Sequence, residues 1–371
     1  YHVADREERL YVIRDGEQVI GCAPMRMRHG RLGLLAALDT DQPGILSLPR
    51  DQERVAQALI EYLCAQERAW GMAEFFGQRR DSALYRASHV DRAGFRTRDF
   101  PLEPYNEIAL VYPDLRAYFQ SLSSKMRSNI GRQARRLYAR GDTQLVLADG
   151  AAATSAWFDA YCDLDRRSWK YGTRASIQRD PRRVRFYQEI VAGRGGLDPS
   201  FIGIVFDGAL IAGLLVGSNG TSAPACHGAW CLEMAYDQSR ADLGPGQLLL
   251  ILAAGEAIGR GDGFLNFLQN FAYYKHRWNA EPIEAISVQL IRRASVHNLR
   301  AWLGDLKRRL RPDSPTAASE PAREQGVPQG PVDEEVQQRS AGLTAAALAA
   351  APAGVRRLDR AAAQAYLPFE L

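Results

Sequence analysis

The chain has 371 residues, of which 46% are hydrophobic and 24% are charged, a composition typical of folded globular proteins rather than disordered ones. This length accommodates one large domain or two ordinary ones. No apolar run reaches the roughly 18 residues that a helical membrane span needs, so we expect no membrane span.

The five cysteines are odd in number and scattered, which argues against a disulfide framework and indicates a reducing, cytoplasmic compartment. Cys226, His227 and Cys231 lie close in sequence, but their spacing matches no zinc pattern. We therefore expect no metal site. Charge is uneven: residues 1–311 carry a net charge of +7, and residues 312–371 carry −3.

The first elements in chain order are two apolar strands, 10–16 and 19–21, around an Asp15-Gly16 hairpin turn. Pro43-Gly44 then precedes an expected helix near 55–70 and a strand at 73–76.

Next comes a strongly basic segment, 123–141, with six basic residues and no acidic one. An apolar stripe at helical spacing predicts a helix that Ser123 or Ser124 caps and Gly141 ends. A second basic stretch, 166–185, contains Lys170 and Arg183 interleaved with Trp169, Tyr171 and Tyr187. Such charge runs suit an anionic ligand or simply a solvated surface.

The opening order of elements then recurs. An Asp207-Gly208 hairpin is followed by Pro245-Gly246, a helix near 247–260 and a strand near 264–268. The matched order predicts an internal duplication, with the first copy clipped at its N-terminal side.

The second copy contains a third strand over 229–237. Strict alternation would place Trp230, Leu232, Met234 and Tyr236 on one face and Cys231, Glu233, Ala235 and Asp237 on the other. Glu233 and Asp237 would then lie near the loop that follows, unless Glu233 is merely solvent-exposed.

That loop is the glycine turn Arg240-Ala241-Asp242-Leu243-Gly244-Pro245-Gly246-Gln247, which leads into a buried helix. Unpaired N–H groups at a positive helix end suit an anion such as a pyrophosphate, although most turns of this kind are only turns.

Residues 312–371 are rich in proline and then in alanine, and we expect a flexible tail there. The expected organisation is a first half at 1–115, a basic connecting helix and strand at 116–150, a second half at 151–311, and the tail.

Several segments together resemble the GNAT-type acetyltransferases of the CelD/BcsL kind, which are associated with cellulose and exopolysaccharide synthesis and are structural relatives of the FemAB aminoacyltransferases. The segments are the basic helix, Ser168-Trp169-Lys170, Asp207-Gly208, Tyr236-Asp237, Leu243-Gly244-Pro245-Gly246 and Tyr274-Lys275-His276-Arg277-Trp278. The resemblance covers roughly residues 9–305.

The resemblance implies an α/β fold of two tandem GNAT-like halves, each a mixed sheet flanked by helices. It also implies acyl transfer, with acetyl-CoA or another acyl-CoA as donor and an amine or hydroxyl as acceptor. The glycine turn would hold the donor through Arg240, Leu243, Gly244, Gly246 and Gln247. Glu233 or Asp237 would act as base, Tyr274 (or Tyr273) as acid, and Lys275 would hold a phosphate or developing charge.

The chain departs from the family pattern at Asn266 and Asn270, where an Asp and a Gly are usual. Three alternatives remain open at this point: an aminoacyl-tRNA-dependent transferase, a non-catalytic module of a polysaccharide synthase complex, and a structural protein. A small-molecule or saccharide acceptor is the expected partner, with tRNA only under the first alternative.

Overall fold

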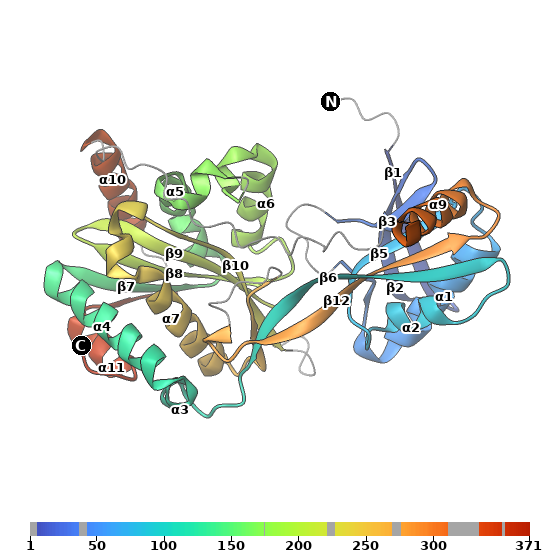
Figure 1. Ribbon diagram of the computed structural model, residues 1–371. Helices are drawn as coiled ribbons and strands as arrows, with labels where there is room; N and C mark the ends of the chain where they lie inside the picture. Colours follow the sequence, from blue (N-terminus) through green and yellow to red (C-terminus); the bar gives the residue numbers. More distant parts are fainter. Residues whose placement is uncertain are drawn as a thin grey trace. The chain divides into compact units, whose positions relative to one another are not determined.

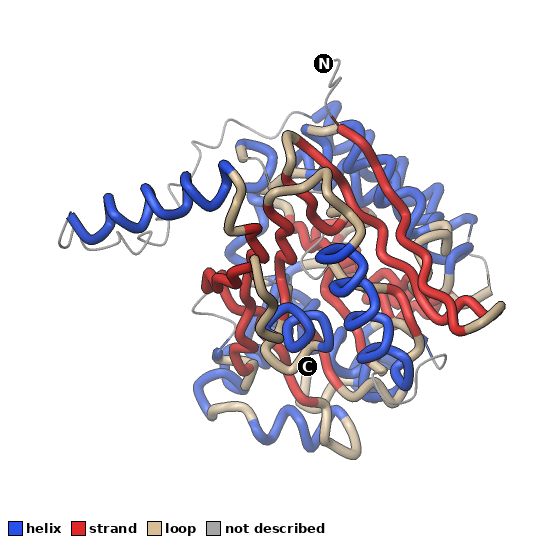
Figure 2. The backbone as a smooth tube through the Cα atoms, turned by 90° about the vertical axis from the view of Figure 1, so that its right-hand side faces the viewer, coloured by secondary structure: helices blue, strands red, loops and turns tan. Residues whose placement is uncertain are grey.

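The computed structural model describes residues 6–36, 43–173, 175–220, 227–268, 276–310, 334–350 and 353–371 (Figure 1). The chain forms two compact units. The first unit takes the chain up to Tyr105 and again from Pro282 through the helix that follows, and the second takes the chain from Asn106 to Leu268 and the C-terminal elements. Each unit contains both strands and helices, which are drawn in red and blue in Figure 2.

The first unit is a mixed sheet in the order β1-β2-β3-β5-β12, with β4 paired to β2. Its elements are β1 (Arg6–Asp15), β2 (Gln18–Arg28), β3 (Arg31–Leu34), β4 (Leu46–Ser47), α1 (Gln52–Ala65), β5 (Met72–Gln78), α2 (Ala83–His89), β12 (Glu281–Arg292) and α9 (Val296–Leu310). The long strand β6 (Phe95–Ala109) carries the chain from the first unit into the second.

The second unit is a mixed sheet in the order β11-β10-β9-β8-β7-β13. Its elements are α3 (Leu115–Ser121), α4 (Ser124–Arg140), β7 (Thr143–Asp149), α5 (Ala151–Arg167), η2 (Trp169–Gly172), η3 (Ile177–Arg179), α6 (Pro181–Val191), β8 (Asp198–Phe206), β9 (Ala209–Ser218), β10 (Gly228–Tyr236), η5 (Gln238–Leu243), α7 (Pro245–Arg260), β11 (Phe264–Asn266), α10 (Glu334–Ala350), β13 (Val355–Leu358) and α11 (Arg360–Tyr366).

The internal duplication is confirmed by the strand pairing. In the first half β1 and β2 form a hairpin, β2 pairs antiparallel with β3, and β3 pairs parallel with β5 across helix α1. In the second half β8 and β9 form a hairpin, β9 pairs antiparallel with β10, and β10 pairs parallel with β11 across helix α7. Both hairpins turn at the expected Asp-Gly dipeptides, where Gly16 and Gly208 have positive φ.

Each half pairs with a strand that follows the other half in the sequence. β12 follows β11 in sequence but pairs with β5, and β6 follows β5 but its last residues pair with β11. Residues 282–310 therefore belong with the first unit, although the sequence order placed them with the second half. No local pattern distinguishes a strand that stays with its own half from one that crosses over.

The second half has apolar cores on both faces of its sheet. One face packs against the buried sides of α4, α7 and α11, and the other packs against α5, α6 and α10. Helix α4 follows the sequence prediction: Ser123 caps it, and its apolar stripe, including Met126, Ile130 and Leu137, is buried. Among the described residues, no helix has the length and apolar character to cross a membrane.

The expectation of a flexible tail is wrong for residues 334–350 and 353–371. Strand β13 pairs antiparallel with β7, and Thr344 on α10 is fully buried and accepts a hydrogen bond from the Leu210 backbone N–H at 3.0 Å. Leu367 is buried in the core beside α4 and α7. Low proline content after position 331 and a few apolar side chains suffice to dock the segment on an open sheet edge. The Pro-rich residues 311–333 lie outside the described residues.

Candidate functional site

The glycine turn adopts the geometry that the sequence predicts. Gly244 is the N-cap of α7 with φ +64° and ψ +39°, and no side chain caps the helix. The positive φ favours glycine there, and a Cβ atom at Gly244 would lie 2.3 Å from the Gln133 side chain, which would have to move. At Gly246 the nearest atom to such a Cβ is Tyr236 Cδ1 at 3.8 Å. The first turn of α7 is therefore uncapped, with room beside it.

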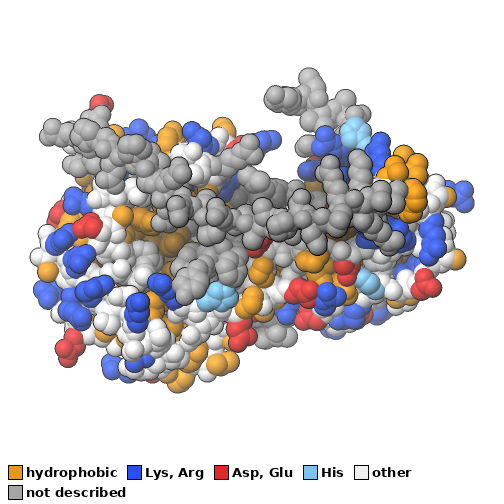
Figure 3. Space-filling model, in the orientation of Figure 1, with side chains coloured by type: hydrophobic (Ala, Val, Ile, Leu, Met, Phe, Trp, Pro, Cys, Tyr) orange, Lys and Arg blue, Asp and Glu red, His pale blue; other side chains and the backbone are white. Residues whose placement is uncertain are grey.

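Cations surround this turn. Arg136 of α4 donates to the Asp242 carbonyl at 2.9 Å, and Arg140 forms an ion pair with the Asp242 carboxylate. The Arg240 guanidinium lies 5.4 Å from the centre of the Phe206 ring. Basic side chains gather over α4 in Figure 3. Arginines beside a positive helix end favour an anionic ligand.

The residues predicted to hold the acyl-CoA donor differ in how deeply they are buried in this turn. Leu243 is 2% exposed and fixes the turn to the core, while Gln247 is half-buried in the first turn of α7. A ligand would therefore meet backbone groups and the side chains of Arg240 and Gln247 in this segment.

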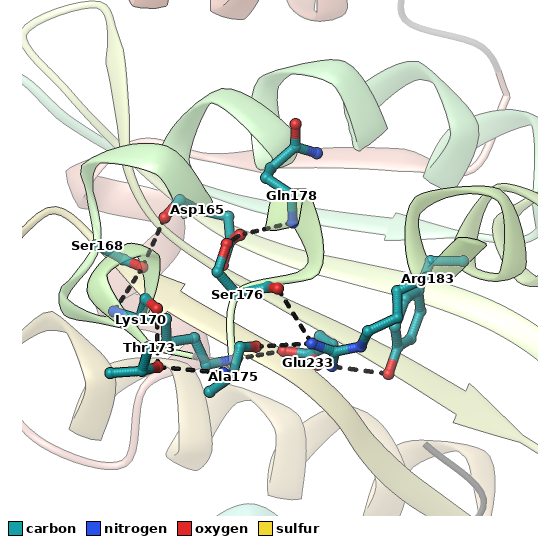
Figure 4. A network of polar contacts seen from close by, with 10 residues as sticks. Asp165, Ser168, Lys170, Thr173, Ala175, Ser176, Gln178, Arg183 and Glu233 are labelled. Carbon is teal, nitrogen blue, oxygen red and sulfur yellow. Dashed lines mark hydrogen bonds and ion pairs between the residues drawn. The ribbon is translucent and has the colours of Figure 1, made fainter. Parts of the chain in front are cut away.

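Glu233 lies in a buried cluster on the face of β10 that points away from α7, towards α5 and α6 (Figure 4). Its side chain is 7% exposed. Oε2 accepts from Lys170, and Oε1 accepts from Arg183 at 2.8 Å and from the Tyr187 hydroxyl at 3.4 Å. Both carboxylate oxygens are therefore occupied by cationic partners.

The same cluster fastens the loop between α5 and α6. Arg183 also donates to the backbone carbonyls of Ala175 and Ser176, at 3.2 and 3.1 Å. Asp165, which is fully buried, accepts from the Ser176 hydroxyl and from the Gln178 N–H. Glu233 thus anchors a loop that displays Trp169 and Tyr171, each more than 40% exposed.

Asp237 is equally engaged. Its Oδ1 caps η5 by accepting from the N–H and hydroxyl of Ser239, at 2.9 and 2.6 Å, and its Oδ2 accepts from Arg167. These contacts hold the start of the glycine turn, because η5 leads directly into Gly244.

The predicted alternation of β10 is wrong before Glu233. A β-bulge interrupts the pairing with β9 at Leu232, so Cys231 packs towards α7 while Leu232 packs with Ala235 on the other face. The extra residue shifts the phase of the strand. Glu233, Ala235 and Asp237 still share the face towards α5, as expected, whereas α7 covers the other face.

Some predicted site residues lie outside the described residues: Asn270, Tyr273, Tyr274 and Lys275. Asn266 is 2% exposed; it donates to the Glu107 carboxylate at 3.2 Å and accepts from the Leu268 N–H at 2.7 Å, which places it in a structural role at the end of β11. No cluster of three or more metal-ligating side chains occurs within the described ranges, and Cys226 falls outside them.

Lys170, Arg183 and Tyr187 were not among the predicted site residues, although Lys170 and Arg183 belong to the basic stretch identified from the sequence and Tyr187 lies just after it. A signal existed for Arg183: it lies four residues before Tyr187 and seven before Ile190, on the buried face of α6. A basic residue on an apolar stripe needs a buried acid as partner.

In the part of the first half that the structure describes, the helix equivalent to α7 starts differently. That helix, α1, begins after Asp51, whose carboxylate is mostly buried at the helix start. Asp51 makes no capping hydrogen bond and forms ion pairs with Arg50 and Arg54, so an acid stands at the start of α1 where α7 has glycine.

Comparisons with known proteins agree with the geometry of the second half. Residues 124–276 match the family described as an acetyltransferase (GNAT) domain. A comparison with curated protein sequences gives no match.

Solved structures resemble nearly the whole chain. The C-terminal DUF2156 domain of a candidate lysylphosphatidylglycerol synthetase from Agrobacterium fabrum has a TM-score of 0.52 at 12% identity, covering 81% of this chain and 88% of that one. L-PGS from Bacillus licheniformis has a TM-score of 0.50 at 13% identity, with the same coverage of 81% and 88%. FemX has a TM-score of 0.43 at 10% identity, covering 81% and 91%.

At these identities the likeness concerns the fold, and neither the comparisons nor the geometry select the CelD/BcsL kind. What the comparisons support is coarser: residues 124–276, less than half of the chain, are similar to the GNAT-type acetyltransferase domain family.

Proposed function

We propose that the second half transfers an acyl group from acyl-CoA to an amine or hydroxyl acceptor, with the donor's pyrophosphate at the start of α7. The observation that carries this proposal is the uncapped first turn of α7, with open space at Gly246 and the arginines of α4 beside it. Uncapped N–H groups at a helix start are a ready-made site for phosphate oxygens.

The residues present fit the donor. Arg240 and Gln247 flank the turn and can contact phosphate oxygens, Gly244 and Gly246 allow a close backbone approach, and buried Leu243 fixes the turn. Bound there, acyl-CoA supplies an activated thioester carbonyl, and this chain's part is to orient it and to move protons.

For the proton transfers we retain Tyr274 as the candidate acid and Lys275 as the group that stabilises developing negative charge. Glu233 and Asp237 are candidate bases only if an incoming acceptor displaces Lys170 or Arg167 from them, because both carboxylates are fully engaged here. Their contacts favour positioning roles: Glu233 holds the α5–α6 loop, and Asp237 holds the glycine turn.

The donor site is tested by Gly246→Asp, with Gly246→Ala as the matched control. Both side chains fit the open space, and an acid in the first turn favours the helix itself, so folding is retained. The added charge opposes the pyrophosphate, and we expect at least about tenfold weaker binding of acetyl-CoA by calorimetry. Equal affinity in Gly246→Asp, Gly246→Ala and the parent protein would remove the turn from the site.

The acid role is tested by Tyr274→Phe in a thiol-release assay. Loss of a positioned proton donor lowers the rate by about 10²- to 10⁴-fold. Acetyl-CoA affinity should stay unchanged, which separates chemistry from binding. A loss of less than about tenfold would assign proton transfer elsewhere.

A second candidate function, transfer of an aminoacyl group from tRNA, is favoured by one observation: Lys125, Arg132 and Arg135 form an exposed basic row on α4. Calorimetry with tRNA at two salt concentrations distinguishes the two, because phosphate contacts weaken steeply with salt. Binding of tRNA without binding of acetyl-CoA would replace the first proposal.

A role in polysaccharide or cell-envelope biosynthesis rests on the CelD/BcsL resemblance and is tested by the acceptor that an active protein uses.

A further inference from the structure

Helix α9, in the first unit, presents an apolar stripe to solvent. Val296, Leu299, Trp302 and Leu303 are 56%, 56%, 53% and 44% exposed. They recur at helical spacing, so they form one face rather than scattered single residues. Figure 3 shows hydrophobic side chains gathered at the position of α9 in Figure 1.

The helix leaves the sheet as it proceeds. It follows β12, and in Figure 2 it is the blue helix that extends to the left, away from the strands of the first unit. Its first turn is tied to the end of β12 through Ser295, whose hydroxyl accepts from the Asn298 N–H at 3.2 Å and donates to the Arg292 carbonyl at 2.7 Å. The stripe thus begins at a fixed base and points into solvent.

Basic residues accompany the stripe. Arg300 on the helix and Arg293 just before the helix are both exposed. An apolar face with a tryptophan, flanked by cations, has the chemistry of a helix that lies in the interface of an anionic membrane. A second copy of the chain would bring the same positive charges together, which disfavours self-association through this face.

We propose that α9 docks this protein on the surface of a membrane that contains anionic lipid. The apolar stripe enters the headgroup region, and the basic residues contact lipid phosphates. Docking through α9 is peripheral, because the helix has 15 residues and does not span a bilayer. The proposal does not depend on the acyl-transfer activity of the second half.

The test is co-sedimentation of the full chain with vesicles of phosphatidylcholine alone and of phosphatidylcholine mixed with phosphatidylglycerol. We expect sedimentation with the mixed vesicles and much less with phosphatidylcholine alone. The double variant Leu299→Ser/Trp302→Ser should reduce the partition by at least about tenfold, and Arg300→Gln by about fivefold. The matched control is Val111→Ser, which removes a still more exposed apolar side chain, 82% accessible, in the second unit.

Three results would overturn the proposal. Equal sedimentation with both vesicle types would show that lipid charge plays no part. A loss of sedimentation in Val111→Ser as large as that in Leu299→Ser/Trp302→Ser would show that α9 is not the docking surface. Failure to sediment, together with a dimer in light scattering that Leu299→Ser/Trp302→Ser abolishes, would assign this face to a second copy. Acetyl-CoA affinity, measured in parallel, should be the same in every variant, so a failed donor site and a failed membrane site give different results.

Discussion

At the scale of single residues, the informative finding is how Glu233 is held. A buried carboxylate with Lys170 on one oxygen and Arg183 with Tyr187 on the other is a complete ion-pair cluster. Such clusters add little net stability relative to apolar residues of the same shape, but breaking one leaves buried charges without partners. The cluster is therefore better suited to fixing one conformation of the α5–α6 loop than to exchanging protons.

The main effect of Glu233→Gln should accordingly be on the stability of the fold rather than on catalysis. We expect a loss of about 3–5 kcal/mol in the free energy of unfolding, because Lys170 and Arg183 stay buried without their acid. The matched control is Glu189→Gln on the same helix as Arg183, an exposed acid paired with Arg194, which should cost less than about 1 kcal/mol. Denaturant unfolding measures both.

A double-mutant cycle completes this experiment. Lys170→Met alone leaves Glu233 with Arg183, and the Glu233→Gln/Lys170→Met pair should be less destabilised than the sum of the two single changes by about 0.5–3 kcal/mol. Unchanged stability with a loss of thiol release of more than about a hundredfold would instead identify Glu233 as the base.

Residue patterns predicted the site unevenly, for physical reasons. The glycine turn was predictable, because Gly244 and Gly246 reflect backbone geometry that is local in sequence. The partners of Glu233 were not, since Lys170 and Arg183 lie 63 and 50 residues away and become its neighbours only through the sheet. The bulge at Leu232 was equally hidden, because the residues on both sides of it fit an ordinary alternating strand.

At the scale of elements, the C-terminal segment departs most from expectation. Its composition is polar and alanine-rich, which indicates weak helix formation in isolation. Its order comes from specific long-range contacts: β13 completes the edge beside β7, and the Tyr366 hydroxyl donates to the Glu256 carboxylate at 2.7 Å. Gly255 on α7 makes room for that tyrosine, as a Cβ there would lie 2.7 Å from its hydroxyl.

Thr344 tests whether α10 is a docked element. Its hydroxyl accepts from the Leu210 N–H at 3.0 Å and donates to the Ser340 carbonyl at 2.8 Å, in a fully buried position. Thr344→Val keeps the shape but leaves the Leu210 N–H without its partner, which should cost about 1–3 kcal/mol. That loss lowers the melting temperature by about 2–4 °C per kcal/mol in a domain of this size.

The control for Thr344→Val is a change at an exposed position of the same helix, Gln338→Ala, where no buried group is affected. Glutamine and alanine are both good helix formers, so this change should leave the melting temperature nearly unchanged. A melting temperature that is equal in Thr344→Val, Gln338→Ala and the parent protein would show that α10 does not dock on β9 in solution.

At the scale of the whole molecule, the two halves share one topology but differ in the sites they carry. In the second half α7 begins at a glycine turn, whereas α1 in the first half begins beside the buried acid Asp51. The first unit instead carries α9. Duplication followed by divergence would account for a proposed donor site in the second half and a different proposed contact in the first unit. The order of elements was predictable from the sequence because hairpin turns are local signals, but the exchange of β6 and β12 was not.

The exchange leads to the final prediction, that the first half does not fold from its own contiguous sequence. Strand β12 supplies Ile286, Val288 and Leu290 to the core of the first unit, where each is no more than 1% exposed. A fragment of residues 1–110 lacks these side chains and leaves β5 without its antiparallel partner. Removing three large core side chains costs roughly 5–9 kcal/mol at the usual value for each, which is comparable to the whole stability of a small domain.

Far-UV circular dichroism and amide dispersion in NMR spectra should therefore show fragment 1–110 to be unfolded. A second fragment, residues 1–110 joined by a glycine-serine linker to residues 281–303, restores β12 to the same chain and should recover cooperative unfolding and native-like dispersion. This pair of fragments separates the missing strand from simple truncation, since both contain the same length of β6. A folded, cooperatively melting fragment 1–110 would contradict the exchange of strands, and with it the division of the chain into the two units described here.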